Sequence, residues 1–345
     1  MIRKTTNLTL LTLITLLTAT ACNDGSPHEQ QPERFRNVVM NKMTPVKDQG
    51  SNNCCWAYAM LSTIETEHLM RGDSIHLSVN YAVRAMLEEQ LVRKYLCRGQ
   101  TGVRERGMGS TLINVIGRNG IVPYDAYHRQ NALPFRAAGK KMNLVIETSI
   151  NTHIGLDRFL TRMKTVFDDT YGPQPRQVYM YGAEYTPQEF ARSVCYPGEY
   201  EALTSFTHHP FGERFVLEVP DNWERNEFLN IPIDSLTETV KQAVREGHGV
   251  CWEGDISEPG FSFRQGTAEW NGPTPTTQAE RQKAFEQFQT TDDHCMAIVG
   301  LARNSEGKLH FVMKNSWGDK NPYQGLMYMS EDYFRMKTIA VFVPQ

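Results

Sequence analysis

The signals for helix and the signals for strand occupy different parts of this chain of 345 residues. Apolar residues at helical spacing predict helices at 54–72, 79–96, 110–118, 157–168, 186–194 and 234–246. Apolar or alternating runs bounded by turn residues predict strands at 215–219, 249–252, 296–302, 309–314 and 339–343. Helices that precede strands indicate an α+β fold with two lobes, at about 45–205 and 206–345. Asp234 is expected to cap the last helix.

The composition is that of a soluble globular protein, with 40% hydrophobic and 22% charged residues. The chain has 36 Lys and Arg against 39 Asp and Glu, a net charge of −3. A protein whose main partner is DNA or RNA would need a basic surplus, so we expect no nucleic-acid partner. No CxxC pair is present, and His208 and His209 have no partner at a metal-ligand spacing. We expect no metal or organic cofactor, a solvated loop around the two histidines and a solvated helical face at 280–283.

The first residues have the features of an export signal. Arg3 and Lys4 precede an uncharged run rich in Leu and Thr, at 7–21, which is too short for a transmembrane helix. Small residues come directly before Cys22, which resembles a bacterial lipoprotein cleavage site, although Ala19 stands where Leu is usual. The alternative is an ordinary signal peptide that is cut nearby.

On the lipoprotein interpretation, residues 1–21 are removed and Cys22 becomes the lipidated first residue. The polar stretch 22–35 then tethers a domain of residues 36–345 to the membrane. This interpretation implies an outer-membrane lipoprotein of a Gram-negative bacterium, facing either the periplasm or the cell surface.

A nucleophile candidate lies where the first long helix is expected to begin. A thiolate is stabilised at a helix N-terminus, because unpaired backbone N–H groups make that position electropositive. Cys54 and Cys55 both occupy this position, and Gln49 lies a few residues earlier. A glutamine amide can donate a hydrogen bond to a developing oxyanion. The alternative is a buried structural cysteine beside a polar loop.

The same run resembles the signature of the papain superfamily of cysteine peptidases. The matching residues are Gln49, Gly50, Cys55, Trp56, Ala57 and Tyr58. The resemblance selects Cys55 over Cys54, because the nucleophile directly precedes the tryptophan. It also implies a helical lobe, an antiparallel, barrel-like β lobe and an active site in the cleft between them.

The superfamily requires a histidine and an asparagine late in the chain, and matching motifs are present. An apolar strand begins at His294, and the pentapeptide 314–318 reads Lys-Asn-Ser-Trp-Gly. The resemblance implies that His294 takes the thiol proton, that Asn315 orients the imidazole and that Trp317 shields their hydrogen bond from water. Trp56 is expected to support the site beside the nucleophile.

The distance along the chain from nucleophile to histidine points to one branch of the superfamily. Cys55 and His294 are much further apart than the ~130–150 residues of papain and cathepsins. Segments that resemble bleomycin hydrolase and aminopeptidase C are 107–124, 186–190 and 279–281. In this branch Gly107 would present its backbone to the substrate, and Met108 would line the pocket for the residue before the scissile one.

Three features depart from that branch. The branch carries a C-terminal arm that restricts cleavage to the substrate N-terminus, whereas this chain ends directly after the last predicted strand, so an open cleft is expected. The branch is typically cytosolic, whereas this chain has an export signal. Asn52 replaces a cysteine that is usually disulfide-bonded. We expect Cys54 and Cys55 to be reduced in the active protein.

The sequence therefore predicts an exported cysteine peptidase, an endopeptidase or an aminopeptidase, that acts on peptide or protein substrates. Two alternatives remain open: an amidase or acyltransferase with the same triad, and a catalytically silent binding protein. The sequence does not indicate the oligomeric state.

Overall fold

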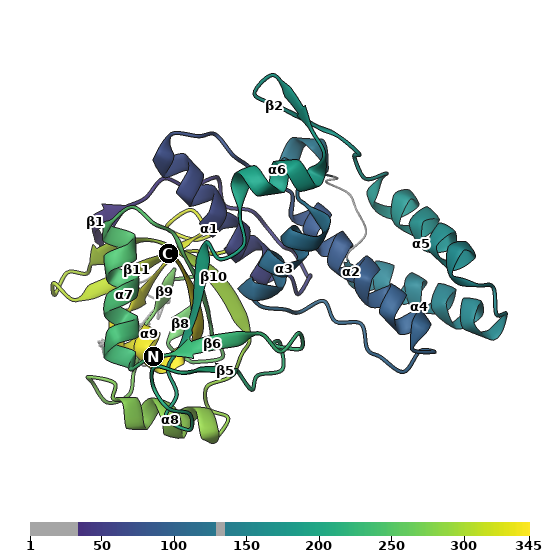
Figure 1. Cartoon of the computed structure of the whole chain (residues 1–345). Helices are drawn as coiled ribbons and strands as arrows, with labels where there is room; N and C mark the ends of the chain where they lie inside the picture. The colour runs from purple at the N-terminus through teal and green to yellow at the C-terminus, as the bar shows by residue number, and fades with distance from the viewer. Residues whose placement is uncertain (1–33, 129–134) are drawn as a thin grey trace, which may run out of the picture. The chain divides into compact units, whose positions relative to one another are not determined.

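A mixed sheet and a group of helices make up the part of the chain described by the computed structural model, residues 34–128 and 135–345 (Figure 1). The predicted leader 1–21, the lipidation site Cys22 and residues 22–33 of the predicted tether lie outside the described residues. Residues Glu33–Gln345 cluster as one compact unit. In the described ranges, no helix is both long enough and apolar enough to cross a bilayer.

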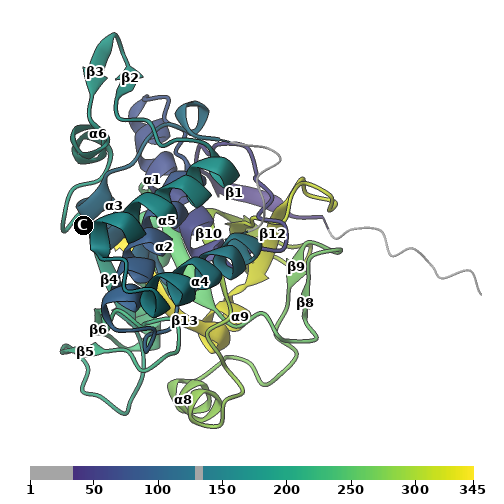
Figure 2. The same cartoon turned by 90° about the vertical axis from the view of Figure 1, so that its right-hand side faces the viewer.

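The described helices before residue 200, α4 excepted, lie close to their predicted positions. They are α1 (Cys55–Arg71), α2 (Val79–Leu96), α3 (Gly109–Asn119), α4 (Phe135–Asn151), α5 (Leu156–Tyr171) and α6 (Pro187–Val194), with a 3₁₀ turn, η1, at Tyr124–Ala126. Helix α4 was not predicted. It packs beside α5, as both views of the fold show (Figure 2).

Helix α1 is the element that joins the helices to the sheet. It contacts α2 and α3 on one side and strands β7 (Val250–Gly254) and β10 (His294–Arg303) on the other. Its residues are therefore buried almost all round from Cys55 to His68. Gly72 ends the helix in the left-handed region at φ 97°, a conformation that costs glycine little.

The large sheet has the strand order β5-β6-β4-β13-β7-β10-β11-β12-β9-β8, and β1 also pairs with β10. The other strands are β1 (Arg36–Met40), β4 (Tyr200–Thr204), β5 (Arg214–Val216), β6 (Glu227–Asn230), β8 (Phe261–Ser262), β9 (Thr267–Ala268), β11 (Leu309–Lys314), β12 (Leu326–Ser330) and β13 (Thr338–Pro344). A separate hairpin contains β2 (Val178–Met180) and β3 (Ala183–Tyr185). The α+β prediction is confirmed, but the sheet is not wholly antiparallel, since β4 pairs with β6 and β12 with β9 in parallel.

The sheet register places the ends of two strands together. In β10, His294 pairs with Gly254 of β7, and Ala297 pairs with Lys314 at the end of β11. Asn315, which follows Lys314, therefore lies near the beginning of β10. Helices α7 (Ile233–Arg245) and α9 (Glu331–Lys337) pack against the same sheet.

Two local predictions are wrong. Pro232 caps α7 in place of Asp234, which lies inside the first turn and pairs with Arg335. Residues 280–283 lie in helix α8 (Gln278–Glu286), but Arg281 and Gln282 are buried. The Arg281 guanidinium donates to backbone carbonyls of Ser205 and Arg335, so burial is accompanied by hydrogen bonding that the sequence pattern does not reveal.

Candidate active site

Cys55 is the first residue of α1, and Cys54 is its N-cap. The Cys54 carbonyl accepts the backbone N–H groups of Ala57 and Tyr58, and the Cys54 side chain makes no capping hydrogen bond. The backbone N–H of Cys55 belongs to the unpaired first turn, which favours a negative charge at the adjacent sulfur. The position of Cys55 is therefore suited to a thiolate.

His294 and Asn315 face each other across the ends of β10 and β11. Imidazole Nε2 of His294 lies 2.9 Å from Oδ1 of Asn315. Because an amide oxygen only accepts, Nε2 carries the proton and Nδ1 remains for Cys55, whose side chain is also hydrogen-bonded to His294. The ring of Trp317 lies 4.8 Å from the imidazole, centroid to centroid. The structure thus brings Cys55 together with the three residues of the late motifs, His294, Asn315 and Trp317.

The charges of this pair are mutually stabilising. The pKa of Cys55 lies well below the usual value of a thiol, chiefly because the Cys295 side chain hydrogen-bonds its sulfur; burial opposes this effect, and the hydrogen bond and charge of His294 add to it. Burial lowers the pKa of His294, but hydrogen bonds to Cys55 and Asn315 outweigh burial and raise it. The favoured state is a thiolate beside an imidazolium.

Cys295 is a site residue that the sequence analysis missed. It follows His294 in β10 and is buried, and its backbone N–H and thiol both hydrogen-bond Cys55. The sequence shows a cysteine directly after the proposed catalytic histidine. No motif spacing indicates that this cysteine contacts the nucleophile. The described cysteines, including Cys54 and Cys55, are unpaired thiols.

Gln49 is held in a fixed orientation in the loop before α1. Its Oε1 accepts a 2.6 Å hydrogen bond from Oγ of Ser316, and its Nε2 donates to the Asn52 carbonyl at 2.7 Å. The second N–H of the amide remains available to an oxyanion. The Asn52 side chain donates back to the Gln49 carbonyl and accepts the backbone N–H of Phe135, so it connects this loop to α4 through hydrogen bonds.

Both predicted substrate residues, Gly107 and Met108, are buried. Gly107 lies next to Arg106, in a segment that Trp56 anchors by donating from Nε1 to the Glu105 carbonyl at 2.9 Å. Met108 is fully buried in the helical core and caps α3. Met108 therefore offers no surface to a substrate in this structure, and the prediction that it lines a pocket is not supported.

A buried acidic group lies next to the nucleophile. Asp221, Glu253 and Asp292 have carboxylate oxygens within 4.8 Å of one another, which is close enough to hold a metal ion. The pKa values of all three are raised, first by burial, and that of Asp221 reaches about 7. The charge of Cys55 raises each of them further, which places the group near the thiolate.

A second group with potential metal ligands contains His208, His209 and Glu218. The two imidazoles contact the Glu218 carboxylate at 3.3 and 2.7 Å and are partly exposed. These residues pair with one another in solvent, which agrees with the predicted solvated loop.

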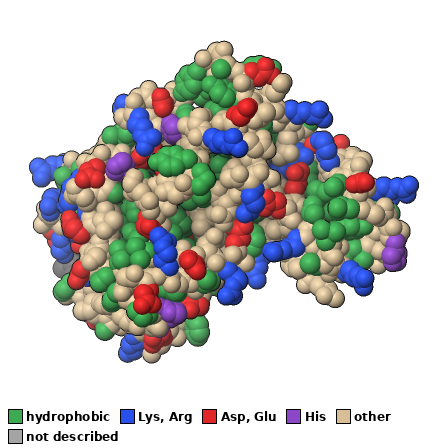
Figure 3. Space-filling view, in the orientation of Figure 1, with side chains coloured by type: hydrophobic (Ala, Val, Ile, Leu, Met, Phe, Trp, Pro, Cys, Tyr) green, Lys and Arg blue, Asp and Glu red, His purple; other side chains and the backbone are tan. Residues whose placement is uncertain are grey.

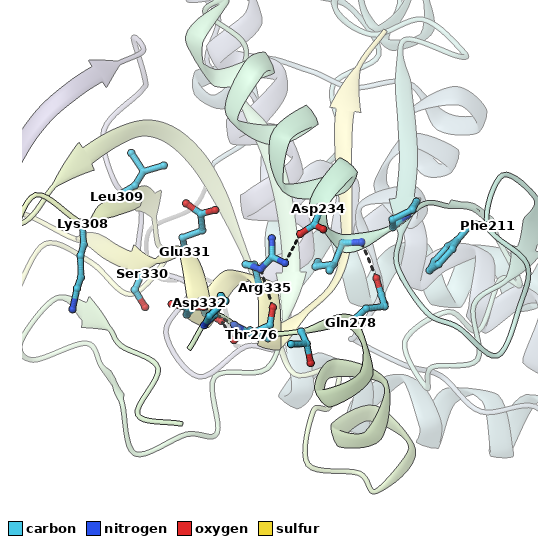
Figure 4. Close-up of a pocket in the computed structure, with 14 residues that line it drawn as sticks. Phe211, Asp234, Thr276, Gln278, Lys308, Leu309, Ser330, Glu331, Asp332 and Arg335 are labelled. Atoms are coloured by element: carbon cyan, nitrogen blue, oxygen red, sulfur yellow. Dashed lines mark hydrogen bonds and ion pairs between the residues drawn. The ribbon is translucent and has the colours of Figure 1, made fainter. Parts of the chain in front are cut away.

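A pocket of about 780 Å³ lies away from these residues, at the N-termini of α7, α8 and α9 (Figure 4). Its polar groups are largely paired with one another: Arg335 with Asp234, and Gln278 with the backbone N–H of Ile233. On the face shown in Figure 3, acidic and basic side chains are interspersed, as expected from the small net charge.

Comparisons with known proteins show the family of this chain. The model of the Peptidase C1-like family matches residues 159–345, more than half of the chain. Cysteine proteinase 1, mitochondrial, of Saccharomyces cerevisiae is 22% identical over 91% of this chain and 77% of its own length. Aminopeptidase G of Lactobacillus delbrueckii subsp. lactis is 25% identical over 42% of this chain and 35% of its own.

A solved structure gives the fold. The crystal structure of PepW from Lactobacillus rhamnosis HN001 matches with a TM-score of 0.73 and 16% identity, over 90% of this chain and 82% of that chain. The predicted papain-like two-lobe fold is confirmed by this likeness.

Proposed function

The chain belongs to the Peptidase C1-like family and is a cysteine peptidase, and we propose that it hydrolyses peptide bonds through Cys55, His294 and Asn315 by way of a thioester acyl-enzyme. The observation that supports this proposal most strongly is the 2.9 Å contact between His294 Nε2 and Asn315 Oδ1. This contact fixes the tautomer in which Nδ1 serves the cysteine. A histidine held only for packing would not need its second nitrogen directed at a thiol.

The acylation step follows from this arrangement. The Cys55 thiolate attacks the carbonyl carbon of the scissile bond, and the carbonyl oxygen becomes an oxyanion. The free N–H of the Gln49 amide and the backbone N–H of Cys55 stabilise that charge. The imidazolium of His294 then donates its Nδ1 proton to the leaving nitrogen, the C–N bond breaks and an amine leaves.

Deacylation uses the same groups in reverse. Neutral His294 takes a proton from water, and the hydroxide equivalent attacks the thioester carbon. The C–S bond breaks, the carboxylic acid leaves and the thiolate–imidazolium pair is restored. This reaction sequence consumes one water for each peptide bond.

The choice between endopeptidase and aminopeptidase is tested with the full chain in reducing buffer. Fluorogenic peptides with a free or an acetylated N-terminus are compared, with Cys55→Ala as the control. Cleavage of the acetylated set indicates an open cleft and endopeptidase activity, and Cys55-dependent cleavage of at least one set is the expected result. Cleavage of the free set alone indicates an aminopeptidase. Absence of Cys55-dependent cleavage of either set would overturn the peptidase proposal in favour of an amidase, an acyltransferase or a binding protein.

We further propose that the protein is exported and anchored by lipid at Cys22. The support is the sequence of the leader: Arg3 and Lys4, the uncharged run and the small residues before the cysteine. The test is metabolic labelling with a radioactive fatty acid and membrane fractionation. Label in the wild-type chain that Cys22→Ser loses supports the anchor, and label-free soluble protein contradicts it.

A further inference from the structure

Two cysteines of the candidate active site are in contact, and neither takes part in a disulfide. The thiol of Cys295 hydrogen-bonds the sulfur of Cys55, and the backbone N–H of Cys295 does the same. Helix α1, which begins at Cys55, packs against strand β10, which carries Cys295, so both sulfurs are held by regular elements and not by loops. A hydrogen bond brings the two sulfurs side by side, and a disulfide can form from that arrangement with a small movement.

The two thiols differ in the way that a peroxide-reactive pair requires. The pKa of Cys55 is lowered, and its side chain keeps 8% of its surface exposed. Burial and the hydrogen bond to Cys55 raise the pKa of Cys295, which is 3% exposed and stays protonated. Hydroperoxides oxidise a thiolate that they can reach, and a neighbouring thiol resolves the product. Cys55 therefore has the properties of the residue that is oxidised first, and Cys295 has those of the residue that resolves it.

The other cysteines near the nucleophile are placed differently. The charge of Cys55 raises the pKa of Cys54 and of Cys251, so both lie near it, but neither of these two thiols is hydrogen-bonded to its sulfur. A bridge between the neighbours Cys54 and Cys55 would also close a small ring and strain the bond. The contacts therefore select Cys295 as the partner of Cys55.

We propose that a hydroperoxide converts Cys55 and Cys295 into a reversible disulfide that switches the peptidase off, a proposal that rests on the proposed role of Cys55 as the nucleophile. The Cys55 thiolate attacks one oxygen of the hydroperoxide, the O–O bond breaks, and the departing oxygen takes the proton of the His294 imidazolium. Cys55 is then a sulfenic acid. The Cys295 sulfur attacks the Cys55 sulfur, the S–O bond breaks, and the hydroxyl leaves as water with the thiol proton of Cys295. The two sulfurs lose two electrons, which the peroxide accepts.

The disulfide would both silence and protect the nucleophile. A sulfur in a disulfide cannot attack a carbonyl carbon, and a resolved sulfenic acid is not oxidised further to the irreversible sulfinic acid. Reduction reverses the change: an external thiolate attacks the more exposed Cys55 sulfur, Cys295 leaves, and a second thiol releases Cys55.

The test follows the disulfide itself by mass spectrometry. The full chain is reduced, freed of reductant, treated with hydrogen peroxide, quenched with catalase, alkylated and digested without reductant. We expect a cross-linked pair of peptides that contain Cys55 and Cys295, and dithiothreitol should separate them. Peptide hydrolysis should fall at least about tenfold after peroxide and return to near its starting rate after dithiothreitol.

Three variants assign the bond. Cys295→Ala cannot form it, so Cys55 should be oxidised to sulfinic acid and dithiothreitol should not restore hydrolysis. Cys54→Ala and Cys97→Ser, which removes an exposed thiol, are the matched controls and should give the same cross-link as the wild type. A cross-link from Cys55 to another cysteine, or sulfinic acid at Cys55 of the wild type without a cross-link, overturns the proposal.

The cross-link is measured whether or not the protein hydrolyses peptides, so the two proposals fail separately. Cys55-dependent hydrolysis without the cross-link would overturn the disulfide and leave the peptidase in place. The cross-link in a protein that hydrolyses no peptide would support the disulfide and contradict the peptidase. If Cys295→Ala does not fold, the cross-links of the wild type and of Cys54→Ala decide the question by themselves.

Discussion

The hydroxyl of Ser316 donates a 2.6 Å hydrogen bond to the side-chain oxygen of Gln49. This bond joins the loop before α1 to the loop after β11, and the backbone repeats the connection, since the Gln49 N–H donates to the Ser316 carbonyl at 2.8 Å. Because the amide oxygen of Gln49 is held by this hydrogen bond, the N–H groups of the same amide point in one fixed direction. The serine beside the proposed triad asparagine is thus a positioning residue for the proposed oxyanion donor.

Removal of the oxyanion donor should lower the turnover number. We expect Gln49→Ala to lower kcat by about 10²–10³-fold with little change in KM, because loss of one such donor has this effect in other peptidases. Ser316→Ala should lower kcat less, by about tenfold or under, since the amide loses its orientation but remains present. Steady-state kinetics with a peptide substrate measure both. An unchanged kcat in Gln49→Ala would remove Gln49 from the mechanism.

Removal of the asparagine should release the imidazole. Asn315→Ala is expected to lower kcat by about 10–10²-fold, since His294 loses the 2.9 Å hydrogen bond that fixes its tautomer and orientation. Met327, whose sulfur accepts from Nδ2 of Asn315, supplies a matched control. Met327→Leu should retain nearly full activity. Equal losses in the two variants would indicate a general packing defect.

The activity should show a bell-shaped dependence on pH. Activity is lost as the pH falls through the lowered pKa of Cys55 and as it rises through the raised pKa of His294, because only the thiolate–imidazolium pair reacts. Cys295→Ala removes the hydrogen bond that lowers the Cys55 pKa most. Its acidic limb should move to higher pH by about one unit, the size expected for one hydrogen bond to a charged sulfur.

Cys195→Ala is the control for that measurement. Cys195 is also buried, but its pKa is raised by burial and by Glu199, not by the catalytic cysteine. The pH profile of this variant should match that of the wild type. An acidic limb that does not move in Cys295→Ala would show that His294 alone sets the thiolate.

A buried ion network near the site should be important for stability. Glu65 in α1 accepts from Lys47 at 3.0 Å and from the Leu77 backbone N–H at 2.8 Å, and it contacts Thr44, which Lys314 in turn contacts at 2.8 Å. Glu65→Gln should lower the free energy of unfolding by about 3 kcal/mol, because two buried or half-buried lysines lose their counter-charge.

Urea denaturation measures that change, with Glu238→Gln as the control. Glu238 pairs with Arg245 on the surface, and loss of an exposed pair has little effect. Burial already lowers the pKa of Lys314 to about 8, and loss of the Glu65 charge should lower it further. Equal stabilities of the two variants would contradict the proposed importance of the network.

Sequence patterns predicted the features that depend on residues close together in the chain. Helix α2 and strand β11 have their predicted bounds, since periodicity and flanking turn residues determine them. Gln49, Cys55, His294 and Asn315 were identified because each lies in a short motif. The structure brings them together at the ends of α1, β10 and β11.

Features that depend on contacts between distant segments were missed. Cys295 is defined only by its proximity to Cys55, and the acidic group near it joins three separate segments. The burial of Arg281 depends on carbonyls supplied from elsewhere in the chain. Met108 was assigned to a pocket from motif position alone, whereas its side chain is fully buried at the N-cap of α3.

The central claim is that Cys55 is the nucleophile of a peptidase. The most direct measurement compares the wild type with Cys55→Ala and Cys54→Ala, both for peptide hydrolysis and for labelling by an epoxide or iodoacetamide, with the labelled residue identified by mass spectrometry. Burial raises the pKa of Cys54 well above the usual value, so Cys54 should be inert. We predict that Cys54→Ala keeps the activity and the label on Cys55. Cys55→Ala should lose about 10⁴-fold or more of the activity, and the label that remains in it should lie on the exposed thiol of Cys97. Hydrolysis that survives in Cys55→Ala, or label on Cys54 in the wild type, would contradict the account.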